Sequence, residues 1–211
     1  MTLSLAISTL LIIAAYLLGS IPTGYLFGRY LKGIDIREEG SGSTGATNVL
    51  RTVGKSAAIA VLLIDLLKGA LALALVNGIY TFQPSLLPAN WYTWLITLAA
   101  LGAIVGHSKS VWLNFTGGKS VATTLGVLLV MNPLVALGTL ASFGVVLAIS
   151  RIVSLSSICG AIAVNILMFA FNQPAAYCAF AAIAGVYVII RHQSNIQRLM
   201  AGVEPKIGQS L

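Results

Sequence analysis

Charged residues are scarce in this chain. Only 8% of its 211 residues are Asp, Glu, Lys or Arg, whereas 58% are hydrophobic. A soluble globular domain carries about 25% charged residues, so the composition excludes one. Five acidic residues, two histidines and two cysteines form no grouped set of ligands. Cys159 and Cys178 both fall in apolar runs. We therefore expect no disulfide framework, no metal site and no cofactor.

Long apolar runs are what the chain has instead. Apolar runs of about 20 residues, each long enough to cross a bilayer, recur along the chain. They predict an all-α fold, a polytopic transmembrane helix bundle. Because no linker and no strong internal repeat interrupts them, we expect one domain over residues 1–211. The seven expected spans are 3–30, 56–77, 91–106, 120–131, 134–150, 155–171 and 175–190. The fourth is short, and a re-entrant or tilted segment is the alternative. The N-terminal run is too long, and lacks the positive start, for a cleavable signal peptide.

The basic residues predict the orientation. With seven spans, nearly all of them fall on loops of one side: Arg29, Lys32, Arg37, Arg51, Lys55, Lys109, Lys119, Arg151, Arg191, Arg198 and Lys206. By the positive-inside rule this side is cytoplasmic, so the N-terminus is outside and the C-terminus is cytoplasmic. Asp65 and Lys68 are the only charges inside a span, and we expect them to pair.

Residues 40–48 (GSGSTGATN) combine three glycines, four hydroxyl residues and an amide. Glycines let backbone N–H groups turn inward around an anion, and a helix N-terminus adds to that attraction. We expect one long helix to follow directly, with Asn48, Arg51 and Lys55 on one face. The alternative is a flexible connector followed by ordinary membrane-flanking cations.

Residues 115–120 (FTGGKS) repeat this design on the second polar loop. The segment is not a nucleotide P-loop, because Leu113 stands where that motif needs glycine. We expect a second anion cradle, with Lys119 as the charge and Ser120 or Thr123 as hydroxyl donors. The alternative is a snorkelling lysine beside a glycine turn.

Two further polar groups lie on the same predicted side. Ser154 belongs to a serine cluster at a helix start, where helix capping alone is the alternative. His192, Asn195 and Arg198 recur every three residues along one helical face of the tail. We expect the tail to join the two cradles.

Together these segments resemble the PlsY-type acyl-phosphate:glycerol-3-phosphate acyltransferases of bacteria over nearly the whole chain. The matching motifs are Gly19–Pro22, Gly40–Asn48, Asp65–Gly69, Gly106–His107 with Phe115–Thr123, and Arg191–Arg198. Five motifs in order on one membrane face make the resemblance specific. Two departures concern the second loop: the family usually has His-x-Phe-Pro where this chain has His107–Ser110, and Gly-Gly-Lys-Gly where it has Ser120.

The resemblance implies transfer of a fatty acyl group from acyl phosphate to glycerol 3-phosphate, giving 1-acylglycerol 3-phosphate and phosphate, at a cytoplasmic-side site in the bacterial inner membrane. The residues expected to be catalytic are Arg51, Lys119, His192 and Asn195. Those expected to bind substrate are Ser41, Gly42, Ser43, Gly45, Thr47, Asn48, Gly117, Gly118, Thr123, Ser154 and Arg198. Either His192 or a substrate phosphate oxygen is the base. The enzyme that makes acyl phosphate is an expected partner, and nucleic acid is not.

Other functions fit the sequence less well. A transporter of a small phosphorylated anion would share the bundle and the cations, but it tends to have repeated halves and a midplane site. A CDP-alcohol-type phosphotransferase needs grouped aspartates on a metal, which five scattered acids do not supply. The chain also lacks the His-x-x-x-x-Asp pair of acyl-CoA-dependent glycerophosphate acyltransferases, so we expect a donor other than acyl-CoA.

Overall fold

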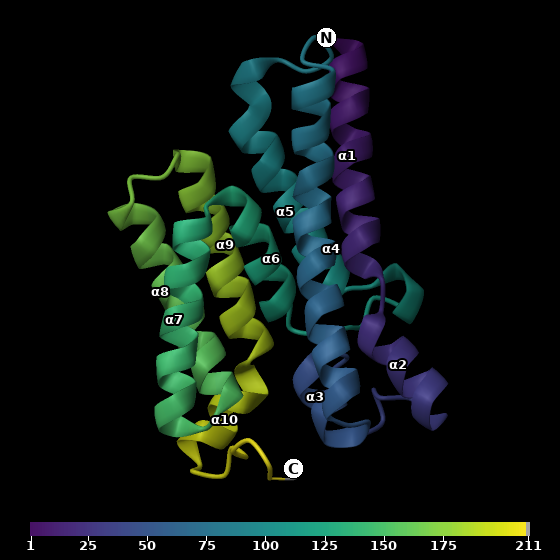
Figure 1. Cartoon of the computed structure of the whole chain (residues 1–211), viewed down its shortest axis with the longest axis vertical. Helices are drawn as coiled ribbons and strands as arrows, with labels where there is room; N and C mark the ends of the chain where they lie inside the picture. The colour runs from purple at the N-terminus through teal and green to yellow at the C-terminus, as the bar shows by residue number, and fades with distance from the viewer. Residues whose placement is uncertain (210–211) are drawn as a thin grey trace.

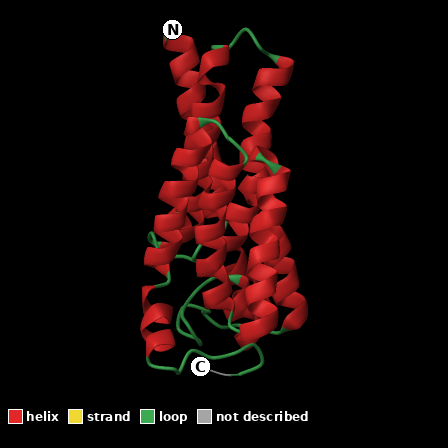
Figure 2. Ribbon diagram, turned by 90° about the vertical axis from the view of Figure 1, so that its left-hand side faces the viewer, coloured by secondary structure: helices red, strands yellow, loops and turns green. Residues whose placement is uncertain are grey.

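The computed structural model describes residues 1–209, and its regular elements there are helical, with one isolated bridge between Ser110 and Thr116 (Figure 2). The helices are α1 Thr2–Ser20, α2 Thr23–Lys32, α3 Ala46–Thr52, α4 Lys55–Phe82, α5 Tyr92–Ser108, α6 Val121–Met131, α7 Pro133–Ser150, α8 Val153–Ala170, α9 Ala175–Arg191 and α10 Gln193–Met200. Short 3-10 turns occupy Ala89–Trp91 and Val111–Leu113. The predicted all-α bundle is confirmed.

The bundle has two halves, joined by α6 and by direct packing of α5 against α9. Helices α1, α4 and α5 pack together, α7, α8 and α9 pack together, and α6 contacts both α4 and α7. Figure 1 shows the N-terminus at one end of the molecule, and α2, α3, α10 and the C-terminal segment at the other. The polar loops and the tail therefore gather at one end of the bundle.

Small residues allow the membrane helices to approach closely. A Cβ on Gly19 of α1 would collide with the backbone of Ala103 on α5, and one on Gly126 of α6 would collide with the Leu66 carbonyl of α4. Without a hydrophobic drive between helices in lipid, such backbone contact is a main source of packing energy. These glycines fix how closely α1 packs on α5 and how closely α6 packs on α4.

The first predicted span is broken near residues 21–22. Helix α1 ends at Ser20 and α2 begins at Thr23, because Pro22 cannot donate a helical hydrogen bond. Beside the break, the Ile21 carbonyl accepts a 2.8 Å hydrogen bond from Lys68 Nζ.

Five segments of the structure are long and apolar enough to cross a membrane. The pair α9 and α10, which is bent by 60°, is a sixth such segment if the two helices count as one span. Helix α6 has only 11 residues, about 16 Å of helix, against a hydrocarbon core of about 30 Å. The expected crossing by α6, and with it the count of seven spans, stays a prediction. Its short length leaves space between α4 and α7, and the site lies there.

Candidate active site

Asn48 organises the first glycine loop. Its Nδ2 lies 3.1, 3.0 and 3.0 Å from the carbonyl oxygens of Ile36, Glu39 and Ser43, and its Oδ1 accepts from the Ser41 N–H at 2.9 Å. The side chain is only 1% exposed. All its hydrogen-bonding groups are thus engaged by the loop. Asn48, predicted to bind substrate, instead holds the shape of the loop that would do so.

The expected long helix after this loop is wrong. Helix α3 ends at Thr52, where the Val49 carbonyl accepts from both Val53 N and Gly54 N, and Gly54 has a φ of +133°. A new helix, α4, starts at Lys55. Arg51 is therefore in the last turn of a short helix, and it does not share a continuous helical face with Lys55. The break turns α3 away from the axis of α4 and leaves Arg51 at the mouth of the cavity described below.

The glycines of the second loop pack against His107. A Cβ on Gly117 would collide with the His107 carbonyl, and one on Gly118 with its imidazole, while Gly118 N–H donates to the same carbonyl at 3.2 Å. The two predicted hydroxyl donors are both buried. Ser120 Oγ donates to the Ile104 carbonyl at 2.8 Å, and Thr123 is fully buried where α6 meets α4. Their role as donors to an anion stays a prediction.

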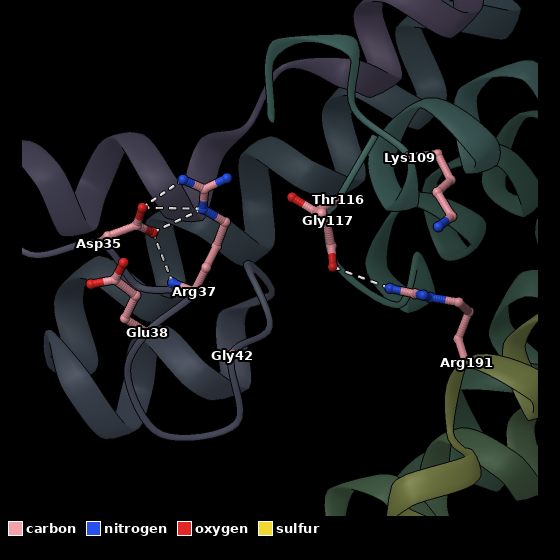
Figure 3. A pocket seen from close by; sticks show the side chains of 8 residues that line it. All are labelled: Asp35, Arg37, Glu38, Gly42, Lys109, Thr116, Gly117 and Arg191. Atoms are coloured by element: carbon pink, nitrogen blue, oxygen red, sulfur yellow. Dashed lines mark hydrogen bonds and ion pairs between the residues drawn. The ribbon is translucent and has the colours of Figure 1, made fainter. Parts of the chain in front are cut away.

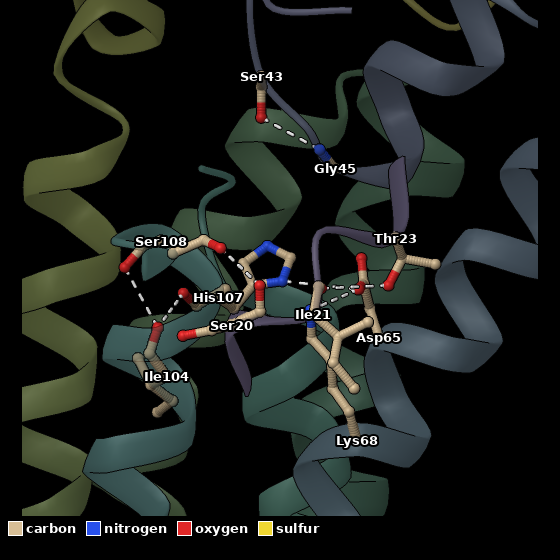
Figure 4. Close-up of polar contacts among 12 residues, drawn as sticks. Ser20, Ile21, Thr23, Ser43, Gly45, Asp65, Lys68, Ile104, His107 and Ser108 are labelled. Carbon is tan, nitrogen blue, oxygen red and sulfur yellow. Dashed lines mark hydrogen bonds and ion pairs between the residues drawn. The ribbon is translucent and has the colours of Figure 1, made fainter. Parts of the chain in front are cut away.

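The buried Asp65 lies between two other polar groups, Lys68 and His107 (Figure 4). Lys68 Nζ is 2.9 Å and His107 Nδ1 is 3.6 Å from Asp65 Oδ1, and all three side chains are at most 5% exposed. The expected Asp65–Lys68 pair is confirmed. Through Ile21 at one end and Gly118 at the other, the three residues connect the α1–α2 break to the second loop.

The tail contains a carboxylate that sequence analysis did not select. Glu204 accepts hydrogen bonds from Ser154 Oγ at 2.6 Å, Asn195 Nδ2 at 2.6 Å and Arg198 Nε at 2.7 Å. Burial acts to raise the pKa of Glu204, but these three bonds outweigh it, so the pKa is lowered and the group stays ionised. Glu204 therefore anchors the tail to the start of α8. The only sequence signal was a lone acid, Gly-Val-Glu-Pro, in a basic tail.

This carboxylate also orients Asn195 toward Lys119. Because Nδ2 of Asn195 is held by Glu204, its Oδ1 is turned outward and accepts a hydrogen bond from Lys119 Nζ. Burial, and after it the nearby arginines including Arg51, lower the pKa of Lys119 to about 8 against the opposing effect of Glu204. Lys119 is thus a cation at neutral pH, held at a defined position and partly desolvated, which strengthens its attraction for an anion.

His192 lies at the junction of α9 and α10 and is 3% exposed. Its Nδ1 is 2.7 Å from the Val188 carbonyl oxygen. Since a carbonyl only accepts, Nδ1 carries the proton, and the neutral ring keeps a lone pair on Nε2. The histidine is therefore arranged as a hydrogen-bond acceptor or proton acceptor.

One cavity of about 770 Å³ brings most of the predicted residues together. The predicted site residues that line it are Ser41, Ser43, Gly45, Thr47, Asn48, Arg51, Lys119, Ser154, His192 and Asn195. In the part of the chain that the structure describes, the Arg51 guanidinium has no protein hydrogen-bond or ion-pair partner and so is free to meet an anion. Beyond this polar mouth most of the lining is apolar, with walls from α4, α6, α7, α8 and α9, and the buried Asp65 and His107 also line the cavity.

A second, polar cleft of about 430 Å³ lies between the first and the second polar loop (Figure 3). Gly42 and Gly117, both predicted to bind substrate, line this cleft and not the large cavity. Its cations are mostly engaged: Arg37 is paired with Asp35 at 2.6 Å, and Arg191 donates to the Gly117 carbonyl at 3.3 Å. Gly118, Thr123 and Arg198 line neither space. Arg198 is held by Glu204 instead.

The sequence is similar to that of known enzymes over nearly its whole length. Residues 9–202 match the family model described as glycerol-3-phosphate acyltransferase. Proteins named glycerol-3-phosphate acyltransferase from Rippkaea orientalis and Crocosphaera subtropica are 67% and 61% identical to the chain. The first match covers 98% of this chain and 95% of the relative, and the second covers 97% and 96%.

Two solved structures have the same fold. Both are of PlsY, described as an integral membrane glycerol 3-phosphate acyltransferase, one in a glycerol 3-phosphate form and one in a lysophosphatidic acid form. Each is 36% identical to the chain, with TM-scores of 0.85 and 0.83. The matches cover 95% of this chain and 96% and 95% of the respective PlsY chains.

Proposed function

The chain belongs to the glycerol-3-phosphate acyltransferase family, and we propose that it transfers a fatty acyl group from acyl phosphate to the 1-hydroxyl of glycerol 3-phosphate. It is a multi-pass membrane enzyme, and its products are 1-acylglycerol 3-phosphate and phosphate. The observation that carries the choice of donor is the large cavity, which combines a cationic mouth with a mostly apolar lining. Such a cavity suits a substrate that has a phosphate at one end and a fatty chain at the other.

Two phosphates must be held at the mouth, and the cations there suffice for both. Arg51 and the hydroxyls of Ser41, Ser43 and Thr47 would bind the phosphate of the donor, with its acyl chain below them in the cavity. Lys119 would bind the phosphate of glycerol 3-phosphate, oriented by Asn195. Ser154 would act mainly through Glu204, which fixes the tail residues. A relative is solved in a glycerol 3-phosphate form and in a lysophosphatidic acid form, which supports these two compounds as acceptor and product here.

The chemistry needs no covalent enzyme intermediate, because an acyl phosphate is already an activated mixed anhydride. The 1-hydroxyl oxygen of glycerol 3-phosphate attacks the acyl carbon, the bond from that carbon to the phosphate oxygen breaks, and phosphate departs with the electron pair. The enzyme positions the two reactants and neutralises charge on the leaving group. The hydroxyl proton goes to His192 Nε2 or to a phosphate oxygen of the substrate, and the held Nδ1–H leaves His192 suitable for this role.

The donor is testable directly. We expect the purified enzyme to form 1-acylglycerol 3-phosphate from palmitoyl phosphate and not from palmitoyl-CoA, because the chain lacks the His-x-x-x-x-Asp pair and the cavity mouth is built around phosphate-sized anions. The measurement is product formation by mass spectrometry with each donor at equal concentration. Equal activity with the CoA ester would contradict the proposed donor.

We also propose that the cavity mouth faces the cytoplasm of a bacterial cell, from the inner membrane. The gathering of the basic loops at one end supports this orientation. A soluble or peripheral enzyme that makes acyl phosphate could then deliver the donor from the same side. We expect a reporter fused to the C-terminus to behave as cytoplasmic and one inserted at Gln83 as external. Finding the two positions on the same side would contradict seven crossings.

A further inference from the structure

The apolar part of the cavity is a shaft that runs along the helices. On α8 its lining extends from Ser154 at the mouth to Val164, and on α9 from His192 to Phe180. At about 1.5 Å per residue, these stretches are about 15 and 18 Å long. One leaflet of a bilayer, half of a hydrocarbon core of about 30 Å, is about 15 Å thick. The shaft is therefore about as deep as an ordinary membrane acyl chain is long.

Small side chains keep the middle of the shaft open. Ser157, Gly160 and Ala161 line it from α8, and Ala184 and Gly185 line it from α9. The two helices touch at this level, since a Cβ on Gly185 would lie 3.0 Å from the Ala161 carbonyl oxygen. They form a continuous wall without filling the space beside it. Larger side chains, Phe143 of α7 among them, line the cavity from the other helices.

Large side chains close the lower end. Phe180 is fully buried, Leu128 is 1% exposed and Val164 is 3% exposed, and all three line the shaft. They belong to the packed hydrophobic core that continues beyond them through Met131, Met168 and Tyr177. The shaft thus ends on close-packed side chains, which do not yield to an extra methylene without strain.

We propose that Phe180, Val164 and Leu128 form a floor that sets the acyl-chain length the enzyme accepts. The proposal rests on the proposed function, because it takes the occupant of the shaft to be the chain of the acyl donor. A chain of palmitoyl length fills the shaft from mouth to floor. A much longer chain meets Phe180, and a shorter one leaves apolar wall uncovered and loses the corresponding burial energy.

The test narrows the shaft at half its depth. A Cβ on Gly160 would lie 3.7 Å from Thr139 Cγ2 and 3.9 Å from Phe143 Cβ, which is ordinary contact with two shaft residues. Gly160→Leu therefore places a side chain in the shaft about 9 Å below Ser154. We expect the ratio of kcat/KM for palmitoyl phosphate to that for octanoyl phosphate to fall roughly tenfold to hundredfold, the range that steric discrimination in an apolar pocket gives.

Gly144→Leu is the matched control. Gly144 is exposed on α7, has nothing within 4 Å of an added Cβ and does not line the shaft. We expect the wild-type ratio in this variant. A Gly160→Leu protein that elutes as wild type in gel filtration and keeps the wild-type ratio, or loses activity equally with both donors, would overturn the proposal.

A second variant deepens the shaft at its floor, and its result does not depend on whether the Gly160→Leu protein folds. Val164→Ala shortens a floor side chain, so we expect use of arachidoyl phosphate relative to palmitoyl phosphate to rise about tenfold. No change in that preference would overturn the proposal. Failure of the underlying function would look different, because the wild-type enzyme would then form no lysophosphatidate from an acyl phosphate of any length.

Discussion

Replacing Arg51 by alanine should lower kcat by roughly 10²–10³, with a smaller effect on either KM. Arg51 lines the mouth of the cavity and is free of protein partners among residues 1–209. In the proposed role it meets the leaving phosphate, whose charge grows only as the anhydride bond breaks. An interaction that strengthens in the transition state affects kcat, and losing one such donor costs about 2.7–4 kcal/mol.

The matched control is Lys32→Ala. Lys32 is an exposed cation at the end of α2, at the same end of the bundle, and it does not line the cavity. We expect near wild-type kinetics from it, which would separate a local role of Arg51 from a general effect of net charge. If a folded Arg51→Ala enzyme also kept the wild-type kcat, Arg51 would be an ordinary membrane-flanking cation and the assignment would be wrong.

Replacing Lys119 by alanine should raise the KM for glycerol 3-phosphate by roughly 30-fold to 1,000-fold and change kcat less. The residue presents a partly desolvated charge at the mouth, and its loss removes a charge-assisted contact worth about 2–4 kcal/mol. A contact made equally in ground and transition states appears in KM. Lys109→Ala, on the exposed part of the same loop and outside the cavity, should leave this KM unchanged.

The charge of Lys119 predicts how the use of glycerol 3-phosphate should depend on pH if Lys119 binds its phosphate. With a pKa of about 8 in the free enzyme, Lys119 is charged below that pH and neutral above it. The kcat/KM for glycerol 3-phosphate should therefore fall as pH rises through about 8. Lys119→Arg keeps its charge in this range, so its profile should stay flat there, at a lower absolute value because the guanidinium does not fit the ammonium position. Identical profiles for the two proteins would contradict the role of Lys119.

The helices and the gathering of the polar loops were predictable, because they follow from local signals. Apolar runs give the spans, Pro22 gives the break between α1 and α2, and a lone pair of charges inside a span has to pair, as Asp65 and Lys68 do. The break between α3 and α4 was not predictable with the same certainty. A single glycine, Gly54, is compatible with a continuous helix, and only its φ of +133° reveals that the chain turns there.

Within the site, the residue types in the sequence predicted the chemistry well, but they did not predict which contacts each side chain makes. Asn48 and Ser120 have side chains that suit a phosphate, but both donate to backbone carbonyls inside the protein. The glycines Gly117 and Gly118 are needed for close packing on His107. Glu204 was missed because its role depends on residues that are distant in the sequence. Its hydrogen-bond partner Ser154, for example, is 50 residues away in the chain. Such pairings depend on tertiary structure, which no local pattern encodes.

The central claim is that both phosphates meet in one cavity and that the acyl group passes directly from acyl phosphate to glycerol 3-phosphate. A single-turnover measurement tests this claim most directly. Enzyme in excess is mixed with palmitoyl phosphate, with and without glycerol 3-phosphate, and free phosphate and lysophosphatidate are followed together. The account predicts phosphate release only when glycerol 3-phosphate is present, with one lysophosphatidate formed for each phosphate. A stoichiometric release of phosphate in its absence, with the acyl group retained on the protein, would contradict direct transfer.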